Sequence, residues 1–125
     1  MSENDHLKGM RVLVVEDEMM ISMLVEDMLQ DLNCTVVGPA NGLAAALELA
    51  GGDGIDAALL DVNLAGQPVF AVADLLRARG IPTIFSTGYG EAGLRDADRG
   101  SAVLQKPFRA VDLARALNQA LKAAA

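Results

Sequence analysis

Five short apolar runs alternate with stretches of helical periodicity along the chain, and this alternation limits the possible folds more than any other feature. The runs lie at residues 11–15, 35–37, 55–61, 83–87 and 103–105. Continuous apolar runs of this length are typical of strands buried on both faces. The chain has 125 residues, which is enough for one domain around a single core. The pattern therefore predicts an α/β domain with helices covering a parallel sheet.

The stretches between these runs space their apolar residues three and four apart, as one face of a helix requires. The first carries two such stripes, Met20–Leu24–Met28 and Ile21–Val25–Leu29, and we expect its methionines to fill the core. Residues 91–101 contain Gly93 and one large apolar residue, so we expect only a short or irregular helix there. The other predicted helices span 19–32, 41–50 with Asn41 as the cap, 68–79 with Pro68 in the first turn, and 111–121.

The order of the strands determines where a ligand can bind. A five-stranded doubly wound sheet with helices on both faces fits the flavodoxin-like order 2-1-3-4-5, with right-handed crossovers. In that order the connections switch direction between the first and third strands. Ligands of such sheets bind at this switch point, beyond the carboxyl ends of the strands. We therefore expect the functional site at the ends of residues 11–15 and 55–61.

Acidic residues occupy both of these strand ends. Glu16 and Asp17 follow the first strand, and Asp61 ends the third. Three carboxylates brought into one crevice repel each other unless a cation lies between them, and Mg²⁺ prefers such oxygen ligands. No Gly-rich loop follows the first strand to hold a phosphate directly. The sequence thus predicts a Mg²⁺ site.

A hydroxyl and an ammonium group stand at the remaining strand ends. Thr87 ends the fourth strand and Lys106 follows the fifth, where both can balance the charge of a phosphoryl group on Asp61. Each residue alone has an ordinary explanation: acids at a helix start, an Asx turn, a strand threonine, a solvated lysine. However, these residues occur in order at the ends of four predicted strands, and this combination favours a shared functional site.

Charge and cysteine content narrow the classes of partner. The net charge is −7, which argues against nucleic acid or an anionic membrane as the main partner. The single cysteine, Cys34, cannot form an internal disulfide and suits a reducing cytoplasm. We expect residues 1–125 to form one domain, with residues 1–8 as a mobile polar leader that is not a signal peptide.

Four segments resemble the receiver domain of the two-component response-regulator family: residues 12–17, 58–64, 84–88 and 104–108. The resemblance spans the chain in the right order. It implies a cis bond before Pro107. It also implies a role for each matched residue: Asp61 as phosphoacceptor, Asp17 as a direct Mg²⁺ ligand, Glu16 as a ligand through water, Asn63 as a ligand through its carbonyl, Thr87 as the switch hydroxyl and Lys106 as the phosphoryl partner.

A narrower resemblance lies in residues 82–89, which are similar to the Pro-Phe-x-Phe-Ala-Thr-Gly-Gly/Tyr motif of an alphaproteobacterial receiver subfamily. Thr83 and Ser86 depart from that motif. Gly88 and Tyr89 complete it, and Tyr89, with Asn63, is expected to modulate the lifetime of the phosphorylated state.

The conformational switch of ordinary receivers has an aromatic residue where this chain has Val103. A valine cannot fill or vacate a space of that size. We therefore expect residues 91–101 to reorder on phosphorylation, with Tyr89 as the alternative means of coupling.

The resemblance implies a stand-alone signalling protein rather than an enzyme acting on an external substrate. It would accept phosphoryl from a histidine kinase or a phosphotransfer protein, with Mg²⁺, and then change its contacts with a downstream protein partner. One alternative is a phosphorylation-independent interaction module on the same fold. Two others are a metal-dependent phosphatase, which the absence of a site histidine disfavours, and a flavodoxin-like cofactor binder, which the acids at the first strand disfavour.

Overall fold

A parallel five-stranded sheet forms the centre of the computed structural model, which describes residues 7–64, 66–88 and 90–124. Its strands run in the order β2-β1-β3-β6-β7, which is the predicted 2-1-3-4-5 order of the five expected strands. Every residue of the central strand β3 is buried, as expected for a parallel strand with helices on both faces. The strands are β1 (Arg11–Val15), β2 (Thr35–Ala40), β3 (Ala57–Asp61), β6 (Thr83–Thr87) and β7 (Ala102–Gln105).

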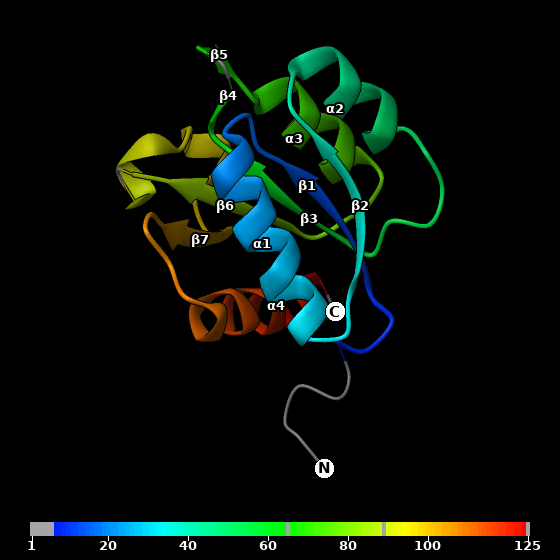
Figure 1. Cartoon of the computed structure of the whole chain (residues 1–125). Helices are drawn as coiled ribbons and strands as arrows, with labels where there is room; N and C mark the ends of the chain where they lie inside the picture. The colour runs from blue at the N-terminus through cyan, green and yellow to red at the C-terminus, as the bar shows by residue number, and fades with distance from the viewer. Residues whose placement is uncertain (1–6, 65, 89, 125) are drawn as a thin grey trace.

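Two pairs of helices cover the sheet (Figure 1). Helices α1 (Met19–Asp31) and α4 (Ala110–Ala124) pack on one face, and α2 (Leu43–Ala50) and α3 (Phe70–Ala78) pack on the other. Alternate residues of each strand enter the two cores, so Val12 and Val14 face α1 while Leu13 and Val15 face α2. No helix in the described ranges is long and apolar enough to cross a bilayer.

The starts of two helices differ from the sequence prediction. Pro68 does not open α3, because it lies in β5 (Gln67–Pro68), which pairs with β4 (Asn63–Leu64) in a small antiparallel hairpin. Proline is tolerated at such an edge, and the helix begins two residues later at Phe70. Asn41 does not cap α2 either. Gly42 occupies the cap position, and no side chain caps the helix there.

Strand β2 is longer than predicted because Gly38 bends it instead of ending it. The register between β1 and β2 shifts there, and pairing resumes at Val15 and Ala40. Gly38 has a φ of 95°, and a Cβ atom would lie 2.8 Å from the Ala40 nitrogen. Only glycine meets both conditions without strain.

Helix α1 buries only one of its two predicted stripes. Val25 and Leu29 are buried, but Met20 and Leu24 are 79% and 56% exposed. The expectation that the methionines fill the core was wrong for Met19, Met20 and Met23, all of which are exposed. Two adjacent stripes of spacing four are equally helical, and only contact with the sheet decides which of them is buried.

The segment between β6 and β7 forms two short 3-10 helices, η2 (Gly90–Gly93) and η3 (Asp96–Asp98), as the prediction of a short or irregular helix implied. Leu94 is the large apolar residue of the segment, and it is buried in the core beside α3. Ion pairs with α3 also hold this segment.

Ser86 gives a stability prediction. The residue is 2% exposed, and its Oγ has no hydrogen-bond partner among the described residues. Ser86→Ala removes a buried hydroxyl with unmet hydrogen bonds, so it should stabilise the fold by about 1 kcal/mol in urea unfolding. Ser22→Ala is the matched control, because the Ser22 hydroxyl is also buried but donates to the Met19 carbonyl at 3.1 Å. A loss of stability in both variants would contradict this account of Ser86.

Candidate functional site

The carboxyl ends of β1 and β3 bring three acids together. Glu16 and Asp17 follow β1, and Asp61 is the last residue of β3, its neighbour in the sheet. Each of them offers a carboxylate oxygen, and these three oxygens lie within 4.8 Å of one another. Glu16 and Asp61 are buried, at 4% and 6% exposed. Charged groups this close and this poorly hydrated require a counter-charge.

Lys106 supplies part of that counter-charge. It follows β7, and its Nζ lies 3.1 Å from Oε1 of Glu16 and 3.3 Å from Oδ2 of Asp61. Its backbone N–H donates to the Thr87 carbonyl at 2.9 Å, which ties the loop after β7 to the end of β6. One ammonium group thus bridges two of the three acids.

The ionisation of the cluster reflects this crowding. Burial, followed by the charge of Glu16, raises the pKa of Asp61 from its ordinary 3.8 to about 7, although Lys106 partly opposes the shift. Burial alone would lower the pKa of Lys106, but its hydrogen bonds and ion pairs with Glu16 and Asp61 outweigh burial and raise it. Lys106 therefore stays charged, and one ammonium group does not neutralise the acids fully.

Thr87, Asn63, Gly88 and Tyr89 are further predicted site residues, and the structure describes the first three. Thr87 is buried at the end of β6, and the Asn63 backbone N–H donates to Oδ1 of Asp61 at 3.3 Å. The proposed use of the Asn63 carbonyl as a metal ligand remains a prediction. Gly88 lies in an exposed turn, and Tyr89 falls outside the described residues.

Val103 and Pro107 complete the predicted set. Val103 is partly buried and lies opposite Phe85 in the pairing of β6 with β7, so this position has no aromatic ring to move. The Lys106–Pro107 bond is cis, as the family resemblance implied.

The arrangement suits a hard divalent cation. Its donors are carboxylate oxygens, the ligand type that Mg²⁺ prefers, and they come from two neighbouring strands. Burial, followed by the charge of Glu16, raises the pKa of Asp61, and a cation between these carboxylates would favour their charged forms. The residues present therefore fit Mg²⁺, which Glu16, Asp17 and Asp61 would hold.

Sequence reasoning missed one group of charged residues, which links α3 to the segment after β6. Asp74 and Arg77 of α3 pair with Arg95 and Asp98 of the segment after β6. Opposite charges three residues apart, within 74–77 and within 95–98, were the visible signal. The sequence did not show that these two short pairs meet each other in space.

Known proteins resemble this chain in both sequence and structure. The sequence matches the response regulator receiver domain family over residues 12–118. The solution structure of SdrG from Sphingomonas melonis Fr1 is 43% identical with a TM-score of 0.82, covering 90% of this chain and 97% of that one. The BeF3-activated conformation of SdrG, from Pseudomonas melonis Fr1, is 44% identical with a TM-score of 0.76, covering 89% and 95% of the two chains.

Curated relatives include the phyllosphere-induced regulator PhyR of Methylorubrum extorquens. It is 31% identical over 114 residues, which cover 88% of this chain and 43% of that protein. The chain spans about half the length of the curated relatives that it matches. The family match itself covers most of the chain and includes all four strand ends of the site. The chain therefore belongs to the response regulator receiver domain family.

Proposed function

We propose that this protein acts as a receiver in a phosphorelay, in which Asp61 accepts a phosphoryl group from a phosphohistidine donor in the presence of Mg²⁺. The observation that carries the proposal is the cluster of Glu16, Asp17 and Asp61 within 4.8 Å, bridged by Lys106. The donor is a histidine kinase or a phosphotransfer protein, and the product changes contacts with a downstream protein partner in the cytoplasm. A phosphorylation-independent interaction module would not need a lysine that pairs with two neighbouring carboxylates.

The chemistry follows from the positions of these side chains. A carboxylate oxygen of Asp61 attacks phosphorus, the phosphorus–nitrogen bond of the donor breaks, and the imidazole leaves with the bonding electron pair. Mg²⁺ held by Glu16, Asp17 and Asp61 would supply positive charge that lessens repulsion between the carboxylate and the incoming phosphoryl oxygens. The Lys106 ammonium group moves one of its hydrogen bonds from a carboxylate oxygen to a phosphoryl oxygen. The Thr87 hydroxyl donates to another phosphoryl oxygen.

Water later attacks the phosphorus of the aspartyl phosphate and regenerates the carboxylate. Asn63 lies beside the acceptor, with its N–H donating to Asp61 and its side chain exposed. We propose that Asn63 and Tyr89 limit the approach of this water and so set the lifetime of the phosphorylated state.

Phosphoramidate tests the proposal directly, because it carries the same phosphorus–nitrogen bond as phosphohistidine. Incubation with Mg²⁺ should add one phosphoryl group per chain by intact-protein mass spectrometry, and hydroxylamine should remove it. The same incubation with excess EDTA should leave the mass unchanged. A modification that forms equally well with EDTA, or that resists hydroxylamine, would contradict an acyl phosphate formed in the acidic cluster.

The outer face of α1 offers a docking surface for a protein donor. Met19, Met20, Met23 and Leu24 are at least 56% exposed on the helix that directly follows Glu16 and Asp17. Beside them lies an apolar cavity of about 300 Å³ between α1 and the loop after β7. Lys106 of the acidic cluster is also in its lining. The apolar face of α1 thus continues through the cavity to Lys106 beside Asp61. We infer that a helical phosphohistidine protein docks on this face, since its histidine must reach Asp61.

Leu24→Lys should separate docking from chemistry. Placing a charge on this face should slow transfer from a phosphorylated phosphotransfer protein by about tenfold or more, because apolar contact with the donor is lost. Transfer from phosphoramidate should stay unchanged, since a small donor needs no docking surface. Ala45→Lys is the control, because it puts the same charge on an exposed position of α2 beyond the sheet. Equal slowing with both donors would contradict a docking role for Leu24.

A further inference from the structure

We propose that Asp98 is a positioning residue of the switch: with Arg77 and Arg95 it holds the segment after β6 against Thr87 and so opposes phosphorylation. This inference rests on the proposed function, since it describes how that function is regulated. It assigns to three charged residues the coupling role that Val103 cannot fill.

The Asp98 carboxylate is the centre of a charge network. Its side chain is fully buried, and its two oxygens accept from two guanidinium groups. Arg77 of α3 donates to Oδ1, and Arg95 donates through Nε to Oδ2 at 2.7 Å. Arg95 also contacts Asp74 of α3 at 2.7 Å and lies 4.4 Å from the centre of the Phe70 ring. A fully buried carboxylate with two charged partners is costly to release, which makes this attachment specific.

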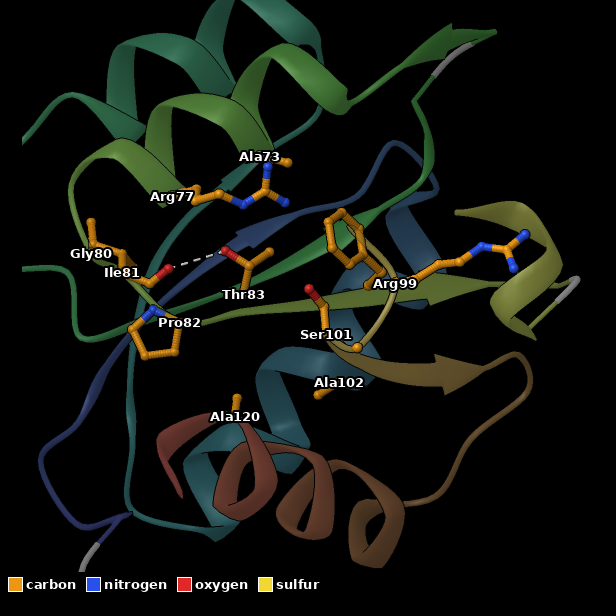
Figure 2. Close-up of a pocket in the computed structure, with 12 residues that line it drawn as sticks. Ala73, Arg77, Gly80, Ile81, Pro82, Thr83, Arg99, Ser101, Ala102 and Ala120 are labelled. Carbon is orange, nitrogen blue, oxygen red and sulfur yellow. Dashed lines mark hydrogen bonds between the residues drawn. The ribbon is translucent and has the colours of Figure 1, made fainter. Parts of the chain in front are cut away.

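Apolar packing contributes little to the rest of the attachment. Leu94 is the large side chain that the segment inserts into the core, and the residues after Asp98 border a cavity of about 450 Å³. Figure 2 shows this cavity between α3, the start of β6 and the turn before β7, with Arg77 on its wall and Arg99 pointing away from it. A segment that borders a cavity depends strongly on its few fixed points. Here these include Leu94, the Asp98 pairs and the contacts of Arg95 with α3.

The other end of the segment contacts the switch residue. A Cβ atom on Gly93 would lie 2.7 Å from Oγ1 of Thr87, so the glycine backbone lies directly against this hydroxyl. Movement of Thr87 toward a phosphoryl group on Asp61 withdraws the surface on which Gly93 rests. The segment must then shift, and the pairs that hold Asp98 five residues later resist the shift. Phosphorylation and release of Asp98 therefore favour each other.

The decisive experiment measures beryllofluoride affinity in the presence of Mg²⁺ by titration of amide NMR signals. Asp98→Asn keeps the shape of the side chain but weakens both ion pairs, and it should tighten beryllofluoride binding about fivefold or more. Asp96→Asn is the matched control, because Asp96 lies in the same short helix but is exposed and pairs with the exposed Arg99 at 3.2 Å. The control should bind like wild type. A purely structural role for Asp98 would lower stability without tightening binding, so equal or weaker binding overturns the proposal.

A second measurement uses the unaltered protein and decides the question if Asp98→Asn does not fold. Amide hydrogen exchange in residues 94–99 should become about tenfold faster when beryllofluoride saturates the site, while exchange in α3 stays the same. Unchanged exchange in this segment overturns the proposal. If wild type binds no beryllofluoride at all, the proposed function fails and the inference fails with it. If wild type binds and Asp98→Asn does not differ from it, the inference alone fails.

Discussion

Asp61→Asn should lose phosphoryl acceptance from phosphoramidate by about a hundredfold or more. The amide keeps the size of the side chain but has no anionic oxygen to attack phosphorus. It also removes one of the three carboxylates that would hold Mg²⁺. The initial rate of mass increase, measured with saturating Mg²⁺, checks this expectation.

Asp53→Asn is the control for that measurement. Asp53 is fully exposed in the loop after α2, and its contact with Arg79 is long, at 3.9 Å. Its substitution changes the net charge by the same amount and should leave the rate unchanged. Persistent modification of Asp61→Asn with the wild-type rate would place the acceptor on another residue.

The second large effect concerns stability and pH. The raised pKa of Asp61, about 7 against an ordinary 3.8, means that the folded state binds this proton more tightly than the unfolded state. Between those two values stability therefore falls as the pH rises, and above about pH 7 the full cost of the buried charge is present. Asp61→Asn removes the cost, so the metal-free variant at pH 8 should be more stable by on the order of 2 kcal/mol.

Thermal unfolding at several pH values checks this expectation. Without metal, the Tm of Asp61→Asn should exceed that of wild type by roughly 5–10 °C at pH 8 and by almost nothing at pH 4. Adding Mg²⁺ at pH 8 should raise the Tm of wild type and leave the variant nearly unchanged, since the cation offsets a repulsion that the variant lacks. A variant less stable than wild type at pH 8 would contradict a net cost of the buried Asp61 charge.

Much of the fold could be predicted from the sequence because its local and global signals agree. Apolar runs such as Val12–Val15 can bury themselves only in the middle of a parallel sheet, and the helical periodicity between them supplies its two covering layers. The strand order then places Glu16 and Asp61 at neighbouring strand ends, and the structure brings them together. Site geometry of this kind follows from topology, which is why remote residues could be grouped in advance.

The errors share one physical cause. Patterns along the chain show that an element exists, but contacts between elements decide where it ends and which face it buries. Pro68 is compatible with a helix start or an edge strand, and its pairing with Asn63 selects the strand. Likewise, Met20 and Val25 belong to equally regular stripes, and the sheet buries only the second.

The charge network around Asp98 is another feature that patterns along the chain could not predict. Arg77 and Asp98 are twenty-one residues apart and belong to different elements, so no local spacing marks their contact. The sequence did indicate a weakly packed segment after β6, from its glycine and its few apolar residues. The three-dimensional structure adds the residues that hold this segment in place.

We propose that the acids at the ends of β1 and β3 form a Mg²⁺-dependent phosphoryl site on Asp61. NMR titration of wild type with beryllofluoride, with and without Mg²⁺, tests it most directly. We expect saturable shifts of the Asp61, Thr87 and Lys106 amide signals only when Mg²⁺ is present. Binding without Mg²⁺, or shifts confined to residues far from these strand ends, would contradict it.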